Sequence, residues 1–118
     1  MVVSIVIVKS KHPEKKYDAV IQRPDGTSKT VSFGQAGASD MTQHKDNKRK
    51  QLYIARHRKT EDWSANGYET AGWLSRWLLW ESPTLTQAAA RINKRFSNIS
   101  ITVKPQVAKS RQQLRQSQ

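Results

Sequence analysis

Hydrophobic residues in the first third of the chain follow the patterns of β-strands. Val2 to Val8 is almost wholly β-branched, which disfavours a helix and predicts a strand covered on both faces. A looser alternation from Lys16 to Arg23 predicts a second strand, and Thr27 to Phe33 predicts a third. Pro24-Asp25-Gly26 lies between these two and is a strong turn signal. The pattern therefore predicts a three-stranded antiparallel meander.

The most apolar stretch runs from Thr70 to Glu81 and holds three of the four tryptophans. At helical pitch the indoles of Trp73, Trp77 and Trp80 form one stripe. Leu74 and Leu78 form the adjoining stripe. Thr70 is a suitable N-cap. We expect this segment to be a buried helix on which the flanking strands and helices pack.

A second amphipathic helix follows the tryptophan-rich stretch. Ser82 or Thr84 can cap it, with Pro83 near its first turn. Its apolar residues recur at i, i+3, i+4, i+7 and i+11, namely Leu85, Ala88, Ala89, Ile92 and Phe96. Strict alternation from 99 to 103 then predicts a short fourth strand, which pairs with the meander or with a neighbouring chain.

Between the meander and the tryptophan-rich stretch lie two loops and a helix. The segment from 34 to 40 has two glycines and predicts a plain connection, because a lone Gly-x-x-Gly is a weak phosphate signal. Asp46 can cap a helix from Asn47 to about Lys59, with little apolar surface: Leu52, Tyr53 and Ala55. The loop from 61 to 67 contains Trp63, which we expect to fold back onto the core.

These elements predict one α+β domain over residues 1–104, with a small antiparallel sheet of three or four strands packed against two or three helices. Residues 105–118 form a polar, basic C-terminal tail that we expect to be flexible. Hydrophobic residues make up 36% of the 118 positions and mean hydropathy is -0.79, so the core must be small.

Charge changes the picture more than any other property of the composition. Lysine and arginine number 21 against 9 acidic residues, a net charge of +12. Such an excess repels itself and usually faces a polyanion. Seven basic residues and one acid lie between 44 and 59, a net +6, and no acid lies beyond Ser82. The candidate polyanion-binding residues are Lys45, Lys48, Arg49, Lys50, Arg56, Arg58, Lys59, Arg91, Lys94, Arg95, Lys109, Arg111 and Arg115.

Several classes of protein are disfavoured. The chain has no cysteine, which excludes disulfides and thiolate metal sites and is compatible with a reducing cytoplasm. The first eight residues lack the features of a signal peptide, and no run is long enough to span a bilayer. His44-Lys45-Asp46 suggests an acid/base or metal group, but consecutive residues do not converge, and capping explains Asp46. Glu61 and Asp62 are better explained as a loop that neutralises the basic helix than as a nuclease pair. We expect no enzyme, no cofactor and no metal.

Motifs in the central region resemble a family of short, basic, functionally uncharacterised proteins encoded by large double-stranded DNA viruses of algae and amoebae. The likeness covers about residues 15–96. Its elements are Phe33-Gly34, Gly37, Ser39-Asp40, Thr42, His44-Lys45-Asp46, Arg49, Tyr53, Arg56-His57, Glu61-Asp62-Trp63, Thr70-Ala71-Gly72, the run from Leu74 to Trp80, Pro83-Thr84-Leu85 and Arg95-Phe96. Asn47 stands where the family has proline, and either residue suits a helix start. The resemblance implies a viral setting and supplies no catalytic residues.

Two functional hypotheses follow. The first is a non-enzymatic structural component of a large DNA virus particle, a minor capsid or internal virion protein that bridges subunits and possibly the genome. It would contact other virion proteins and be found in the virion, and in the host cytoplasm or viral factory during assembly. The second is a DNA- or RNA-binding protein acting in viral replication, transcription or genome condensation. A hydrolase would need a carboxylate and histidine cluster that the spacing does not provide. The oligomeric state stays open.

Overall fold

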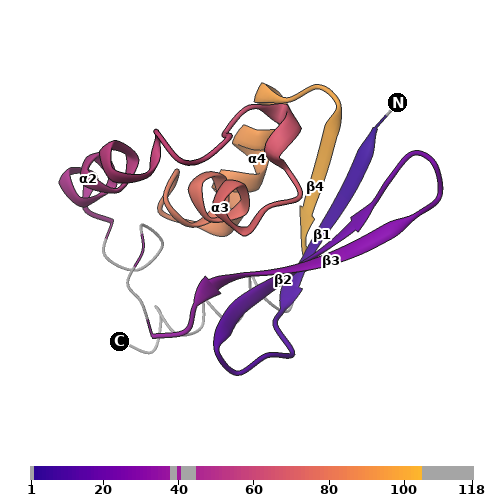
Figure 1. The fold of residues 1–118 in the computed structure, drawn as a ribbon, viewed down its shortest axis with the longest axis horizontal. Helices are drawn as coiled ribbons and strands as arrows, with labels where there is room; N and C mark the ends of the chain where they lie inside the picture. The colour runs from indigo at the N-terminus through magenta and orange to yellow at the C-terminus, as the bar shows by residue number, and fades with distance from the viewer. Residues whose placement is uncertain (1, 38–39, 41–44, 105–118) are drawn as a thin grey trace.

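A four-stranded sheet with helices on one face forms the body of the computed structural model, which describes residues 2–37, 40 and 45–104 (Figure 1). The strands are β1 (Val3–Lys9), β2 (Lys15–Gln22), β3 (Ser28–Gln35) and β4 (Ile99–Val103), in the order β3-β2-β1-β4. The first three pair antiparallel, which confirms the predicted meander. The fourth strand pairs with β1 in parallel, so the sheet is mixed and the α+β class is confirmed.

The sheet buries one face only, which corrects the expectation that the first strand is covered on both. In β1 the alternate residues Val3, Ile5 and Ile7 are buried, whereas Val6 and Val8 between them are partly exposed. Because side chains alternate across a strand, a single covering layer of helices buries every second residue. The β-branched run reflects strand propensity here and not two-sided burial.

Turn residues join the strands of the meander as the sequence indicates, with one difference. Gly26 takes a φ of 92° in the turn between β2 and β3, where the Asp25 side chain accepts hydrogen bonds from Thr27. The third strand continues past Phe33 to Gln35, so the glycine segment begins inside the sheet. Gly34 has a φ of 78°, and a Cβ there would lie 2.9 Å from Cδ1 of Leu79. The glycine thus permits close packing and is not part of a plain connection.

The tryptophan-rich segment is buried at the centre, but it is not one regular helix. Thr70 caps α3 (Ala71–Leu74) through its hydroxyl, and the chain then continues as a π-helical turn over Ser75–Leu79. Each π-helical residue rotates less than an α-helical one, because the hydrogen bond spans five residues. Trp73 and Trp77 are buried as predicted, whereas Trp80 leaves their stripe and is half-buried. The expectation of a single stripe of three indoles is therefore wrong for Trp80.

The indole nitrogens of the two buried tryptophans tie the preceding loop to the core. Trp73 Nε1 donates to the carbonyl of Ser64 at 2.8 Å, and Trp77 Nε1 donates to the carbonyl of Trp63 at 3.0 Å. This loop includes a short 3₁₀ turn, Ala65–Gly67. Trp63 itself packs against the core, as predicted. Asp62 accepts hydrogen bonds from Ser64, so it shapes the loop, and among the described residues it makes no ion pair with the basic helix.

The last helix, α4 (Leu85–Arg95), follows its amphipathic pattern closely. Thr84, one of the two candidate residues, caps it, while Ser82 is buried. Leu85, Ala88, Ala89 and Ile92 are buried against the sheet and the tryptophan-rich segment. Phe96 packs against Trp73 and Trp77, with both ring-centroid distances 5.5 Å.

The same helix also covers the edge of the sheet at β4. The Asn93 side chain accepts from the Ile101 N–H at 2.7 Å and donates to the Ile101 carbonyl at 3.0 Å. An unpaired strand edge is a template for pairing with another chain. Asn93 occupies both main-chain groups of Ile101 at the middle of this outer edge. Of the two predicted pairings of the fourth strand, the described residues show the one with the meander, through β1.

Candidate nucleic-acid interface

The basic helix α2 (Asn47–His57) begins at Asp46, whose side chain accepts from the backbone N–H groups of Lys48 and Arg49 at 2.9 and 3.4 Å. This confirms the predicted cap. No acidic residue lies in the first turn, where the helix dipole disfavours cations. The Asp46 carboxylate offsets part of that penalty, and it explains how so cationic a segment still forms a helix.

Few contacts hold α2 against the body, and none of its residues is buried. The Tyr53 ring stacks on Trp80 with a centroid distance of 4.4 Å and an interplanar angle of 7°, and Trp63 lies 6.4 Å away, nearly parallel. Burial raises the pKa of Tyr53 to about 12. Lys50 Nζ lies 3.2 Å from Oε1 of Glu81 and donates to its carbonyl at 3.0 Å. These two anchors leave the opposite side of the helix open, and α2 projects from the body (Figure 1).

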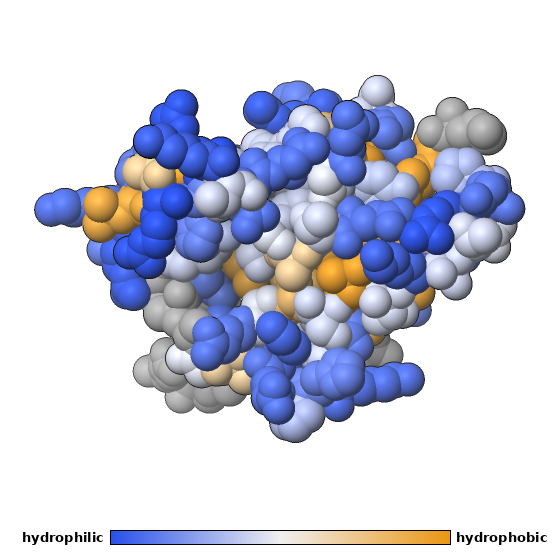
Figure 2. Space-filling view, in the orientation of Figure 1, coloured by the Kyte–Doolittle hydropathy of each residue, from blue (hydrophilic) through white to orange (hydrophobic). Residues whose placement is uncertain are grey.

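Cationic side chains lie on α2 and in the residues that flank it. Six of them, Lys45, Lys48, Arg49, Arg56, Arg58 and Lys59, are exposed, and none of the carboxylates among the described residues forms an ion pair with them. We call these six residues together with Leu52 the α2 basic face. Of the three residues that supply the little apolar surface of this helix, Leu52 and Ala55 are exposed, Leu52 by 57%, and Tyr53 is half-buried. In Figure 2 this end of the molecule is mostly hydrophilic with a small apolar patch among the polar side chains.

Asp46 is the one acid between residues 45 and 59, and most of the other acids serve contacts elsewhere in the fold. Asp40 is buried against Lys16, and Asp18 accepts a hydrogen bond from Ser32 at 2.6 Å. Glu69 binds Arg23 through two hydrogen bonds of 2.7 and 2.8 Å. The hydrogen bonds from Arg23 lower the pKa of Glu69 to about 2. The excess positive charge is therefore concentrated on surfaces such as α2.

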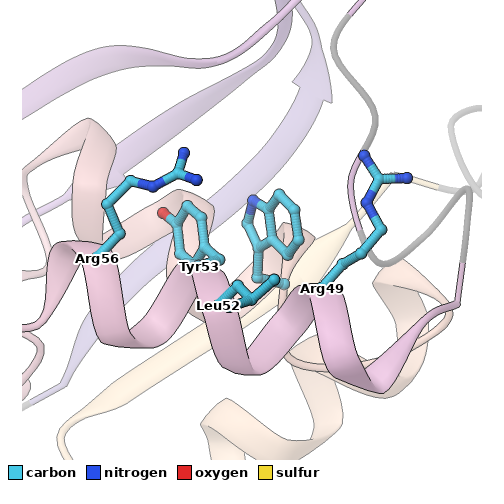
Figure 3. Close-up of a pocket in the computed structure, with 5 residues that line it drawn as sticks. Arg49, Leu52, Tyr53 and Arg56 are labelled. Carbon is cyan, nitrogen blue, oxygen red and sulfur yellow. The ribbon is translucent and has the colours of Figure 1, made fainter.

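A surface pocket of about 260 Å³ lies along the seam between α2 and the body. It is lined by Arg49, Leu52, Tyr53, Arg56 and Trp80. Figure 3 shows Arg49 and Arg56 at the two ends, with Leu52 and Tyr53 between them. The pocket thus combines two guanidinium groups with an apolar and aromatic floor.

Glu81 connects the basic helix with the basic end of α4. Its carboxylate lies 3.0 Å from Arg76 Nη1 and 3.6 Å from Arg91 Nη1, in addition to Lys50. Burial raises the pKa of Glu81, but Arg76 and Lys50 outweigh burial and the net pKa is lowered. The carboxylate therefore stays ionised at neutral pH and neutralises part of the charge of three cations.

The α4 cations take different positions from those of α2. The Arg95 guanidinium lies 4.8 Å above the Trp77 ring, while the Lys94 side chain is exposed. Of the predicted polyanion-binding residues, Lys50 and Arg91 contact Glu81, and the α2 basic face collects six others. The remaining three, Lys109, Arg111 and Arg115, lie outside the described residues.

Sequence reasoning missed the three residues that position the site. Glu81 was not singled out, Trp80 was assigned to the core stripe, and Arg76 was not distinguished from the exposed cations. Arg76 is only 9% exposed, with its guanidinium over the rings of Trp63 and Trp77 at 5.3 and 4.4 Å. The signal that the sequence offered for these residues is Trp80-Glu81, a tryptophan followed by an acid at the end of the apolar segment.

The histidine and acidic side chains of the described residues do not form a metal-binding group. No three or more histidine, cysteine or acidic side chains there lie close enough to hold a metal ion. The His57 ring packs against Tyr53 in a tilted arrangement, with a centroid distance of 4.4 Å, and His44 lies outside the described residues. The helices of the described ranges are also too short or too polar to cross a bilayer.

The fold and this interface define a small α+β protein with a protruding cationic helix, and comparison with known proteins adds one finding. Residues 5–57 match a family described as "Family of unknown function (DUF5754)". The matched stretch is less than half of the chain and runs through β1, β2, β3 and α2, ending at the last residue of the basic helix. No curated protein and no solved structure matches the chain.

Proposed function

We propose that this chain is a non-enzymatic nucleic-acid-binding protein whose α2 basic face lies along the phosphates. The observation that supports this best is that six exposed cations lie on a projecting helix and in the residues flanking it, with no carboxylate ion-pair partner among the described residues. Like charges at this density repel one another, and neutralisation by phosphates relieves the repulsion and releases counterions. DNA and RNA both offer this chemistry.

Salt-dependent binding tests the proposal, because each neutralised phosphate contributes to the slope of log K against log salt. Fluorescence anisotropy with labelled DNA between about 50 and 200 mM salt gives that slope. Replacing Lys48, Arg49 and Arg56 with glutamine should reduce the slope by about 2 to 3 and weaken binding at low salt. The side chains of these three residues make no ion pair among the described residues, so the fold should be retained.

A control with the same loss of charge separates this face from net charge. Lys9, Lys11 and Lys15 are exposed and lie on β1, β2 and the turn between them. Their replacement with glutamine should leave most of the slope intact. Equal effects of the two triple variants would mean that total charge and not the α2 basic face drives binding. Absence of binding to DNA or RNA at low salt would refute the proposal.

A second candidate function is the structural role in a virus particle, as a minor capsid or internal virion protein. The resemblance over about residues 15–96 supports it, and the α2 basic face would then meet the genome or acidic surfaces of other virion proteins. The corresponding location is the virion, with the host cytoplasm or viral factory during assembly. Quantitative proteomics of purified particles tests this role, and absence of the protein from the particles would refute it.

A further inference from the structure

Leu52 is unusual among the apolar residues because it is exposed in the middle of a cationic surface. It and Val2 are the large hydrophobic residues that the structure leaves exposed in the described ranges, at 57% and 51%. A face that bound phosphates alone would have no use for an apolar side chain at this point. Leu52 also lines the seam pocket, so the apolar contact and the pocket belong to the same site.

The two arginines of the pocket bracket Leu52 along the helix. Arg49 and Arg56 are seven residues apart, which corresponds to about 10 Å along the helix axis. Their guanidinium groups stand at the two ends of the pocket, with Leu52 and Tyr53 between them (Figure 3). Guanidinium forks suit phosphate oxygens. Two phosphates held at the ends would place the intervening part of a strand over the apolar floor.

The size and lining of the pocket limit what can enter it. Its volume of about 260 Å³ lies below the roughly 300 to 1,000 Å³ of pockets for drug-sized ligands. One planar ring fits this space better than a complete cofactor does. Aromatic and apolar surfaces contact the face of any base without regard to its hydrogen-bonding edge. The pocket therefore suits a nucleobase that projects from its backbone.

Other ligands with both anionic and apolar parts fit less well. A helix that lies on a lipid surface needs a broad apolar face, and Leu52 is surrounded by charged residues on the α2 basic face. In a duplex the bases are stacked and present only their edges in the grooves. A ring cannot enter a pocket on the seam of the protein unless it leaves that stack.

We propose that the α2 basic face recognises single-stranded nucleic acid, seating one unpaired base against Leu52 between phosphates bound by Arg49 and Arg56. This inference rests on the proposed nucleic-acid-binding function and specifies its ligand. Affinity comes mainly from the phosphates, and the preference for a single strand comes from the contact between the base and the pocket. No particular base is selected, because Leu52 contacts the face of the base and the guanidinium groups of Arg49 and Arg56 bind the phosphates.

The experiment compares three labelled ligands of equal length by fluorescence anisotropy: an oligothymidine strand, an abasic strand and a duplex. The wild type should bind the thymidine strand about five- to tenfold more tightly than the abasic strand. Leu52→Ser should lose about fivefold in affinity for the thymidine strand and nothing for the abasic strand. Val2→Ser removes the other exposed apolar side chain and should change neither value.

The outcomes separate this inference from the function on which it rests. Replacing Arg49 and Arg56 together with glutamine should weaken binding of all three ligands. If it weakens none of them, the proposed function of the α2 basic face fails. If it weakens all three while Leu52→Ser leaves every affinity unchanged, or lowers all three equally, the assignment of a base to the pocket is overturned. Equal affinity of the wild type for thymidine and abasic strands would overturn it as well.

Discussion

Removal of the Tyr53 ring should release α2 from the body without unfolding the core. The ring is half-buried and stacks on Trp80 at 4.4 Å, and the other described anchor of the helix is Lys50 at Glu81. An isolated helix of 11 residues is only marginally stable in water. Loss of this contact should therefore let α2 fray as a local event.

The expected magnitude for Tyr53→Ala follows from three contributions. The stacked pair contributes about 1 kcal/mol beyond burial, and half-burial of the ring contributes about another 1 kcal/mol. The higher helix propensity of alanine offsets about 0.5 kcal/mol. The free energy of local opening should fall by about 1.5 kcal/mol, so the population of the open helix should rise by about tenfold.

Amide hydrogen exchange measures this opening residue by residue. Amides in the last two turns of α2 should exchange about tenfold faster in Tyr53→Ala, while those of β1 keep their wild-type protection. Tyr53→Phe retains the stacked ring and serves as the control. If the α2 amides keep wild-type protection in the alanine variant, the stack on Trp80 does not hold the helix. If β1 loses protection equally, α2 is part of the core and not a separately anchored element.

Two further predictions concern side chains that bind residues in or next to the sheet strands, Glu69 at Arg23 and Asn93 at Ile101. The pKa of Glu69 is about 2 against an ordinary 4.5, so its contribution to stability is complete above about pH 4.5 and is lost as pH falls towards 2. The melting temperatures of wild type and Glu69→Gln should therefore differ at pH 7 and converge near pH 2, and a constant difference would contradict the role of the bond with Arg23. Asn93→Ala should lower the free energy of unfolding in urea by about 1 to 2 kcal/mol and increase light scattering by self-association, because the main-chain groups of Ile101 become unpaired. The neighbouring exposed Lys94→Ala should change neither measurement.

Patterns with a short period were enough to predict most of the fold. The meander, the Asp46 cap and the burial of one face of α4 follow from alternation, capping chemistry and helical spacing, each of which acts within a few residues. Parallel pairing of β4 with β1 was not predictable in this way. The two strands lie about ninety residues apart in the chain, and their pairing depends on how the helices between them pack.

The candidate interface shows the same division. Its charge could be read from the sequence, because an excess of lysine and arginine between 44 and 59 does not depend on folding. Which cations reach solvent was decided by tertiary contacts: Lys50 turns inward to Glu81, while Arg49 and Arg56 flank an exposed Leu52. The π-helical turn, which no pattern indicated, moves Trp80 out of the core stripe and under Tyr53.

The sequence by itself thus determined most of the secondary structure, the amphipathic face of α4 and the sign of the charge, because these depend on neighbours along the chain. Only the tertiary structure decided how the basic helix is anchored and what its open side presents. Those features require residues from α2, the loop around Trp63 and the segment after the π-helical turn to meet, and their distances in space bear no simple relation to their separation in sequence.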